Sequence, residues 1–328
     1  MTHTILTAFA AVALAGSCAS AQLVPDRLYF GVDRPVPMTV TIPDDAKGDA
    51  VVELYAPGAD KPSASAPVAA GTVNLAALFP SLWSDKTTNV QYAQLKVGDA
   101  AVGSPVVIQP LLNARPAVGG NGGQVQVPPR TGPLSGIRAY TEKFVQFDTT
   151  YGPITFKLRP DQAPNTVWNF RTLVEGGFYT DIVFHRIIGP SADNPNGFMA
   201  QVGDPTGTGG GGPGYNIDLE DSKLPHDFGV LSMARTGDPN TNGSQVFVCF
   251  SREGTSFLDG NYCAFAQAVD GADAIVQLGA HPVEAKGREK SNPVDPKPKL
   301  TSAKLVDAPP IGQQPKPLTK PAGAAPTR

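Results

Sequence analysis

The chain has 328 residues, of which 41% are hydrophobic, and its formal net charge at pH 7 is −3. This length and apolar content are enough for two domains with separate cores. The slight acidic excess argues against a general nucleic-acid binder, because such proteins concentrate positive charge to displace phosphate counterions. The 33 prolines and 35 glycines are numerous, but the apolar fraction excludes a chain that is disordered throughout.

The N-terminal residues have the pattern of a secretory signal peptide. Residues 5–15 are an apolar run too short to span a bilayer, and residues 19–21 (ASA) fit an A-x-A cleavage site. Residues 1–4 contain no Lys or Arg, so the prediction depends on the run and the cleavage site. We predict a signal peptide over residues 1–21 and a periplasmic or secreted protein. The alternatives are a buried N-terminal strand or helix, and lipidation of Cys18 in a degenerate lipoprotein box.

Residues 22–113 have an all-β pattern. Short runs rich in β-branched residues occupy residues 37–42, 50–55, 68–75, 90–97 and 106–112. Pro, Gly and Asp between these runs indicate turns. The spacing predicts a small immunoglobulin-like or fibronectin-like β-sandwich, with a helical turn near residues 76–83. Because no polar cluster stands out here, we expect a spacer or adaptor domain.

Two further segments are predicted to lack regular structure. Residues 114–141 are rich in Gly and Pro without a lasting apolar period, which predicts a linker that lets two domains move relative to one another. Residues 309–328 combine frequent Pro with few apolar residues, which predicts a disordered tail that activity does not need.

Residues 142–308 form the second predicted domain. A helix is predicted to begin at Pro164 and to end at Gly176, because Val167, Phe170 and Val174 recur at helical spacing. A second short helix is predicted near residues 272–278. Strands are predicted at residues 144–148, 154–158, 182–188, 198–203, 229–233, 246–250, 262–269 and 300–307. Many short strands with two helices favour a closed antiparallel barrel that is capped at both ends.

One cation stands on an otherwise apolar stretch, residues 184–204 (FHRIIGPSADNPNGFMAQVGD). Arg186 lies among Phe184, Ile187 and Ile188, and the neutral amide of Gln201 follows. A half-buried Arg costs several kcal/mol unless its donors find acceptors. Arg186 is therefore either one partner of a structural ion pair or a donor that faces a substrate.

Other reactive residues give no sign of hydrolytic, metal or cofactor chemistry. The four histidines have no metal-ligand spacing, and His185, which alternates with Arg186, is predicted to be a core or surface residue. The Gly-rich residues 207–214 lack the Lys and Ser/Thr of a phosphate loop. Cys249 and Cys263 form either one disulfide or, as their apolar surroundings favour, two buried thiols.

Five blocks in the second domain, FHRII, GFMAQVGD, LSMAR, PNTNGSQVFV and FLDG, closely resemble the cyclophilin family of peptidyl-prolyl cis-trans isomerases. The resemblance extends over residues 142–308, and residues 235–239 (RTGDP) are more similar to the bacterial form of the family. It implies an eight-stranded barrel with a helix over each opening, isomerase activity without a cofactor or metal, and proline-containing segments of exported proteins as partners of a monomer.

The resemblance also implies roles for individual residues. Arg186 would be the catalytic donor, oriented by Gln201, and Phe247 would complete the catalytic set. The residues implied to bind substrate are Phe198, Met199 and Leu258 in an apolar socket for proline, Phe257 and Tyr262 at its rim, and Ala234, Arg235 and Gln245 along the peptide.

Three departures from the family pattern bear on function. Residues 189–196 extend a turn that is shorter in typical members and are expected to affect access to the site. Phe257 stands where the family often has Trp, and Tyr262 where it often has His; both keep an aromatic ring, so catalysis is expected to survive. Because phenylalanine has no N–H donor, weak cyclosporin binding is expected from Phe257. Two other classes of function remain: a module that binds proline-containing segments without a need for catalysis, and a structural envelope protein with a decayed barrel, which a complete socket disfavours.

Overall fold

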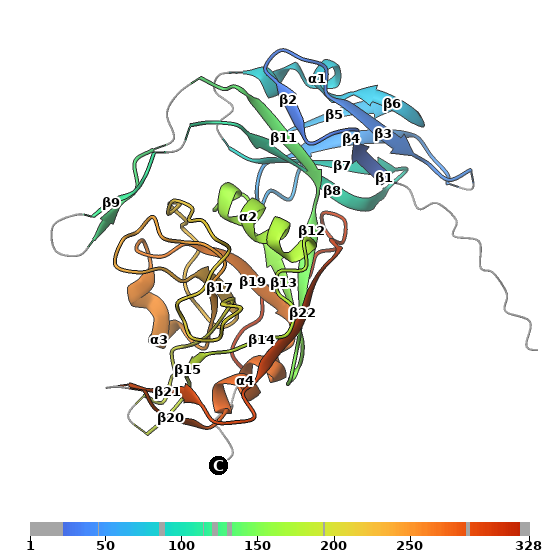
Figure 1. Ribbon diagram of the computed structural model, residues 1–328. Coiled ribbons are helices and arrows are strands. Elements are labelled where there is room, and N and C mark those ends of the chain that lie inside the picture. The colour runs from blue at the N-terminus through green and yellow to red at the C-terminus, as the bar shows by residue number, and fades with distance from the viewer. Residues whose placement is uncertain are drawn as a thin grey trace, which may run out of the picture.

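The computed structural model describes residues 22–44, 46–84, 89–113, 115–119, 124–129, 133–192, 194–286 and 289–321, which form two mainly β domains, one above the other in Figure 1. The predicted signal peptide and Cys18 lie outside these residues. Within the described ranges no helix has both the length and the apolar character needed to cross a membrane.

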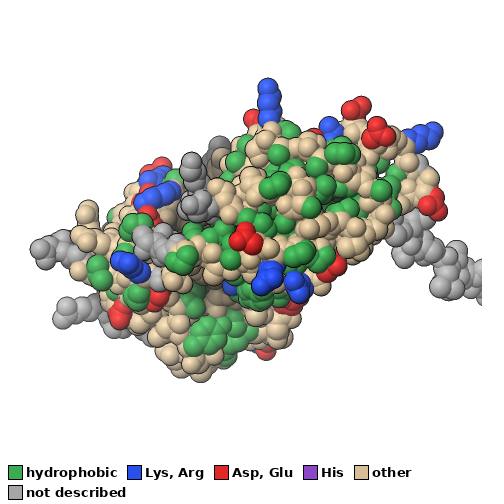
Figure 2. Space-filling model, turned by 90° about the horizontal axis from the view of Figure 1, so that it is seen from above, with side chains coloured by type: hydrophobic (Ala, Val, Ile, Leu, Met, Phe, Trp, Pro, Cys, Tyr) green, Lys and Arg blue, Asp and Glu red, His purple; other side chains and the backbone are tan. Residues whose placement is uncertain are grey.

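The N-terminal domain is a sandwich of two antiparallel sheets. The larger has the order β2 (Tyr29–Gly31), β11 (Gly136–Thr141), β8 (Ala100–Pro110), β7 (Gln91–Val97), β4 (Ala50–Tyr55), β5 (Ala64–Val68), and the smaller has the order β1 (Gln22–Pro25), β3 (Pro37–Thr41), β6 (Gly71–Asn74). Residues of both sheets, such as Met38 and Leu54, share one core. A short helix, α1 (Leu75–Leu78), and a 3-10 turn at Pro80–Trp83 stand where a helical turn was predicted. On the face seen from above, Lys and Arg are scattered among Asp and Glu (Figure 2).

The predicted linker is wrong at its C-terminal end. Residues 136–141 form β11, which pairs with both β2 and β8 and buries Ile137 and Ala139. This strand leads through Glu142 directly into the second domain. Earlier in the segment, β9 (Val118–Gly119) and β10 (Val125–Gln126) pair with each other, and Ala117 is buried in the core of the second domain. The described part of the segment is thus docked, and the expected free movement between domains is not supported.

The second domain is a sheet that curls back on itself. Its strands have the order β14 (Ile182–Val183), β22 (Lys299–Asp307), β12 (Lys143–Thr149), β13 (Gly152–Leu158), β19 (Ala264–Asp270), β17 (Val230–Met233), β18 (Val246–Cys249), β16 (Met199–Val202), β15 (Arg186–Ile188). The first and last of these are successive parts of one stretch, which closes the eight-stranded barrel predicted from the sequence. Helix α2 (Pro164–Glu175) lies at the end that faces the sandwich, and α4 (Ala272–Ala280) lies at the opposite end (Figure 1).

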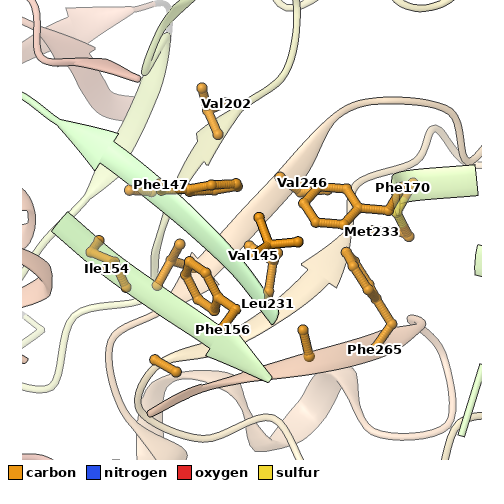
Figure 3. Packing of buried hydrophobic residues seen from close by; sticks show 14 of the residues in the cluster. Val145, Phe147, Ile154, Phe156, Phe170, Val202, Leu231, Met233, Val246 and Phe265 are labelled. Atoms are coloured by element: carbon orange, nitrogen blue, oxygen red, sulfur yellow. The ribbon is translucent and has the colours of Figure 1, made fainter. Parts of the chain in front are cut away.

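Aromatic side chains from strands and helix fill the barrel (Figure 3). The ring centroids of Phe147 and Phe156 are 5.1 Å apart, and those of Phe170 and Phe265 are 5.0 Å apart. Helix α2 carries Phe170 inward because its apolar residues recur on one face, and Pro164 begins the helix without the loss of a needed hydrogen bond. The Glu220 carboxylate accepts hydrogen bonds from the first free backbone N–H groups of this helix.

The outer face of α2 packs against the sandwich. The rings of Trp168 and Tyr140 have centroids 5.2 Å apart, and the guanidinium carbon of Arg138 lies 4.5 Å from the centroid of Trp168. Arg171 lies over Tyr140 at 4.8 Å and donates a hydrogen bond to the carbonyl of Thr141. Arginine over an aromatic ring stabilises such contacts best where water is excluded, so these pairs link the two domains.

The predicted disorder of the tail is wrong for residues 309–321. The backbone N–H of Ile311 donates to the Gln94 side chain of the sandwich at 2.9 Å, and that of Leu318 donates to the Ala268 carbonyl of the barrel at 2.8 Å. The Leu318 side chain packs against the barrel core. The segment therefore crosses both domains as an extended strap, and residues 322–328 lie outside the described residues.

Truncation after Ala308 is expected to lower the melting temperature by several degrees, because it removes the packing of Leu318 and the bonds to both domains. Thermal unfolding of the mature protein measures this. Lys316→Ala, a change at an exposed position of the same strap, is the matched control and should leave the melting temperature unchanged. A truncated protein as stable as the full chain would show that the strap contributes nothing.

Glu142 lies buried where the two domains and the strap meet. Its backbone N–H donates to the Pro105 carbonyl, and its carboxylate accepts a hydrogen bond of 2.8 Å from the Gln314 amide. Burial raises the pKa of Glu142 to about 7, an effect that the nearby positive charge of Lys157 only partly offsets.

Glu142→Gln should stabilise the protein progressively as the pH rises from about 5 to 8. The pKa of Glu142 is higher in the folded protein than in the unfolded chain, so this carboxyl supports the fold while protonated and weakens it as it ionises. Melting temperatures of the two proteins across this pH range test the effect. Glu253→Gln, which removes a carboxylate at an exposed position, is the control variant measured at the same pH values. A Glu142→Gln shift that does not grow with pH would contradict the assignment.

Candidate active site

A hollow of about 450 Å³ opens on the outer surface of the barrel. It lies over β15, β16 and β18 and beside a short helical segment, α3 (Arg252–Thr255) with the 3-10 turn Ser256–Leu258. The residues that line it are Arg186, Phe198, Met199, Gln201, Ala234, Arg235, Phe247, Phe257, Leu258, Asn261 and Tyr262. The structure therefore brings together all the site residues predicted from the sequence except Gln245, which lines the neighbouring hollow.

Strand alternation builds the apolar floor of this hollow. In β18, Val246 and Val248 belong to the barrel core, whereas Phe247 and Cys249 belong to a second apolar cluster outside it. Met199 in β16 and Leu258 in the 3-10 turn join this outer cluster, and both are buried. Phe247 is 4% exposed. The floor is apolar and buried, as a socket for a proline ring requires.

Aromatic rings form the walls and rim of the hollow. The ring of Tyr262 meets Phe247 edge to face, with centroids 6.1 Å apart. Phe257 stacks on Phe198 at 5.5 Å and is 66% exposed, so it stands at the rim as predicted. The guanidinium of Arg235 lies 4.4 Å from the Tyr262 centroid and donates to the Asn261 carbonyl, which fixes that wall.

Arg186 lies at the polar edge of the hollow, and an acid from outside the predicted site binds it. Its Nε donates to Oε2 of Glu289 at 2.8 Å, and its Nη2 donates to Oε1 at 2.7 Å. Arg186 is thus an ion-pair partner that also lines the hollow, and its role as a donor facing a substrate stays a prediction. Gln201 is its neighbour in the β15–β16 register, but the Gln201 amide donates to Gln245 at 2.7 Å. The expected orientation of Arg186 by Gln201 is replaced by the bond to Glu289.

A second hollow of about 450 Å³ adjoins the first and shares Gln201, Ala234 and Arg235 with it. The Gly-rich residues 209–214 form one side. Gln245 holds this loop, since its amide donates to the carbonyls of Gly209 and Gly211. Because they share Gln201, Ala234 and Arg235, the two hollows form one groove.

Asp204 fixes the Gly-rich loop from within. Its carboxylate accepts backbone hydrogen bonds from Thr206, Thr208 and Gly209. These bonds hold the pKa of Asp204 well below its usual range, although burial opposes the shift. A Cβ on Gly211 would lie 2.0 Å from Oδ1 of Asp204, so only glycine allows this close approach.

Comparison with known proteins agrees with this geometry. The family model for "cyclophilin type peptidyl-prolyl cis-trans isomerase/CLD" matches residues 144–304. Peptidyl-prolyl cis-trans isomerase-like 1 of Emericella nidulans is 42% identical over 169 residues, which cover 50% of this chain and 95% of that protein. A peptidyl-prolyl cis-trans isomerase of Synechococcus elongatus is 46% identical over 123 residues, which cover 38% of this chain and 78% of that protein. The chain belongs to the cyclophilin-type peptidyl-prolyl cis-trans isomerase family.

Solved structures similar to this cyclophilin include a Cryptosporidium parvum cyclophilin-type isomerase. It is 33% identical, with a TM-score of 0.45, and the match covers 51% of this chain and 99% of that one. A second structure of that protein was determined in the presence of the dipeptide Ala-Pro, with a TM-score of 0.44.

The sequence did not reveal a polar cluster beneath the floor of the cyclophilin socket. Buried His226 stacks on Phe247, and its Nδ1 and Nε2 lie 2.9 Å from Asp259 and Ser232 respectively. Asp259 also pairs with Arg252 of α3, which joins the two ends of this short helical segment. Burial lowers the pKa of His226, and His226 and Ser232 are both buried beneath the socket, so neither is accessible from solvent.

Three smaller predictions can now be assessed. Cys249 and Cys263 are both buried thiols, as favoured, and burial raises the pKa of Cys249. His185 is buried in the barrel at 3% exposure. Of the described residues in 189–196, none lines either hollow, and Gly189 packs against Gly279 of α4. The expected effect of this extension on access stays a prediction.

Proposed function

We propose that this cyclophilin accelerates X-Pro isomerisation in exported or envelope proteins, with Arg186 as the catalytic donor. Membership of the isomerase family supports the reaction. The observation that carries the assignment is the position of Arg186 as the charged edge of a hollow whose floor, Met199, Phe247 and Leu258, is apolar and buried.

The reaction needs neither a nucleophile nor proton transfer. Resonance in the X-Pro amide produces a rotational barrier of about 18–20 kcal/mol. A guanidinium close to the proline nitrogen stabilises the twisted amide, in which the lone pair is localised, more than the planar one. In this proposal the socket holds the proline ring while the preceding carbonyl rotates, and Gln245 and the backbone near Ala234 and Arg235 align the peptide.

The exported setting is supported by the signal-peptide pattern of residues 1–21. Expression of the full chain in a bacterium, followed by cell fractionation and mass spectrometry of the purified protein, tests it. Cleavage after Ala21 in a periplasmic or secreted fraction is the expected result. A lipid-modified Cys18 would favour the membrane-tethered alternative, and an intact N-terminus in the cytoplasm would contradict export.

The alternative function is a non-catalytic module that binds proline-containing segments, as a chaperone-like adaptor would. The sandwich domain favours it, because it adds a second domain beside the groove without any catalytic cluster of its own in its described part. A monomer fits either function. The two differ in whether the loss of Arg186 abolishes turnover or only weakens binding.

Arg186→Ala should lower kcat/KM by at least about a hundredfold and leave the melting temperature nearly unchanged, because the donor acts mainly on the twisted amide. Arg186→Lys should rescue little, since an ammonium does not reproduce the planar fork. A protease-coupled assay with a chromogenic proline tetrapeptide measures both variants. Full activity of folded Arg186→Ala would remove the proposed mechanism.

Phe257→Trp should tighten inhibition by cyclosporin with little change in kcat/KM. In the family, an indole N–H at this position donates to cyclosporin, whereas phenylalanine has no donor to offer. A hydrogen bond contributes about 0.5–1.5 kcal/mol net, so the inhibition constant should fall by roughly threefold to tenfold. Measurement of both constants for the two proteins tests this, with Phe257→Leu as a control that alters the rim without adding a donor. Unchanged inhibition by cyclosporin after Phe257→Trp would exclude position 257 as the cause of weak binding.

A further inference from the structure

The partner of Arg186 comes from a hairpin late in the chain, β20 (Val283–Lys286) paired with β21 (Glu289–Pro293). Glu289 is the first residue of β21, and its carboxylate accepts two hydrogen bonds from Arg186. Ser291, a buried residue two positions further along β21, also donates to this carboxylate. Hydrogen bonds from Arg186 and Ser291 lower the pKa of Glu289, so the carboxylate is ionised at neutral pH.

The base of this hairpin is fixed to the barrel. The backbone N–H of Val294 donates to the Pro282 carbonyl at 3.0 Å. His281 Nε2 lies 2.9 Å from the Val294 carbonyl and must donate there, because a carbonyl only accepts. His281 Nδ1 therefore accepts the hydroxyl of Tyr151 at 2.7 Å, from the turn between β12 and β13. Since β21 also lies against β15, Glu289 is held beside Arg186 by the fold.

The bonds to Glu289 occupy one edge of the guanidinium and leave the other free to act. A guanidinium has five N–H donors in one plane. Glu289 accepts from Nε and from Nη2, so both N–H groups of Nη1 and one of Nη2 remain. Because the group is planar, fixing one edge fixes the direction of the opposite edge. Arg186 lines the hollow and Glu289 does not, so the bound edge faces away from the hollow.

This ion pair contributes to the geometry of the site more than to the stability of the fold. The side chains of Arg186 and Glu289 are 36% and 42% exposed, and an ion pair in such a position adds little to stability. A long arginine side chain without a partner would sample many rotamers, and the entropy lost on ordering it would then raise the barrier of the reaction. With Glu289 in place, much of that ordering precedes substrate binding.

We infer that Glu289 is the positioning residue of the active site: it holds the Arg186 guanidinium with its Nη1 edge toward the proline socket. This inference rests on the proposed role of Arg186. Glu289 contacts no reacting atom, and its effect should appear in kcat, where the orientation of the donor matters, more than in KM, which the apolar socket determines.

Glu289→Ala should lower kcat by about fivefold to tenfold with a less than twofold change in KM, through the lost ordering of Arg186. Glu289→Gln, which keeps one acceptor, should lie between that variant and the wild type. Glu284→Ala is the matched control, because Glu284 is an acid of the same hairpin that pairs with Asn292, and its removal should leave both constants unchanged. The ¹⁵Nε–¹Hε NMR signal of Arg186 should be sharp in the wild type and should move and broaden in Glu289→Ala.

A double-mutant cycle with Arg186→Ala separates positioning from support of the fold. Glu289→Ala should have no further effect on kcat when Arg186 is absent. An equal loss in both backgrounds would mean that Glu289 acts on the fold, and would overturn the inference. A Glu289→Ala protein as active as the wild type would also overturn the inference. So would a more active one, because it would show that the carboxylate inhibits Arg186. If Arg186→Ala itself proves fully active, the catalytic role of Arg186 fails, and that result is distinct from every outcome for Glu289.

Discussion

The isomerase site depends on the period of two along β16 and β18. Each strand has one face in the barrel core and the other in the socket, so Val248 and Phe247 cannot exchange places without damage to both. A slip of one residue would turn Phe247 inward and present a valine to the substrate. The packed rings of Phe147, Phe156, Phe170 and Phe265 exclude that register, because a close-packed interior has no room for another large side chain. The shape of the socket is therefore a consequence of the packing on the other side of the same strands.

The same principle of two faces couples the domains. Helix α2 directs Phe170 into the barrel and Trp168 toward the sandwich, where Arg138 and Tyr140 contact it. Strand β11 continues into β12 with only Glu142 between them, and the strap of residues 309–321 returns across both domains. The described part of the chain therefore joins the two domains in three ways: through packed rings, through a continuous strand and through the strap.

Local patterns predicted most of the fold, and long-range partners account for what they missed. The barrel strands and both capping helices lie within a few residues of their predicted bounds, since period and turn residues are local signals. The predicted linker included β11, whose Arg138 and Tyr140 contact Trp168, a partner about thirty residues later in the chain. The strap has the composition of a disordered tail, yet Gln94, Glu142 and Ala268 supply its hydrogen bonds. The composition of a segment does not show whether residues elsewhere in the fold accept its hydrogen bonds.

In the site, too, local motifs were predictable from the sequence and long-range partners were not. The motifs placed the eleven predicted residues in one groove, but Glu289 stands 103 positions from Arg186 in a charged stretch that reads as solvent-exposed surface. The partial exposure of Arg186 explains how the protein keeps a cation beside an apolar socket at a low desolvation cost. If Arg186 were fully buried, every N–H group of its guanidinium would need an acceptor in the protein. No N–H group would then remain to bind a twisted amide. At the barrel edge, part of the guanidinium is exposed to solvent, two hydrogen bonds join it to Glu289, and the floor below is apolar and buried, so a charged group and an apolar surface border the same hollow.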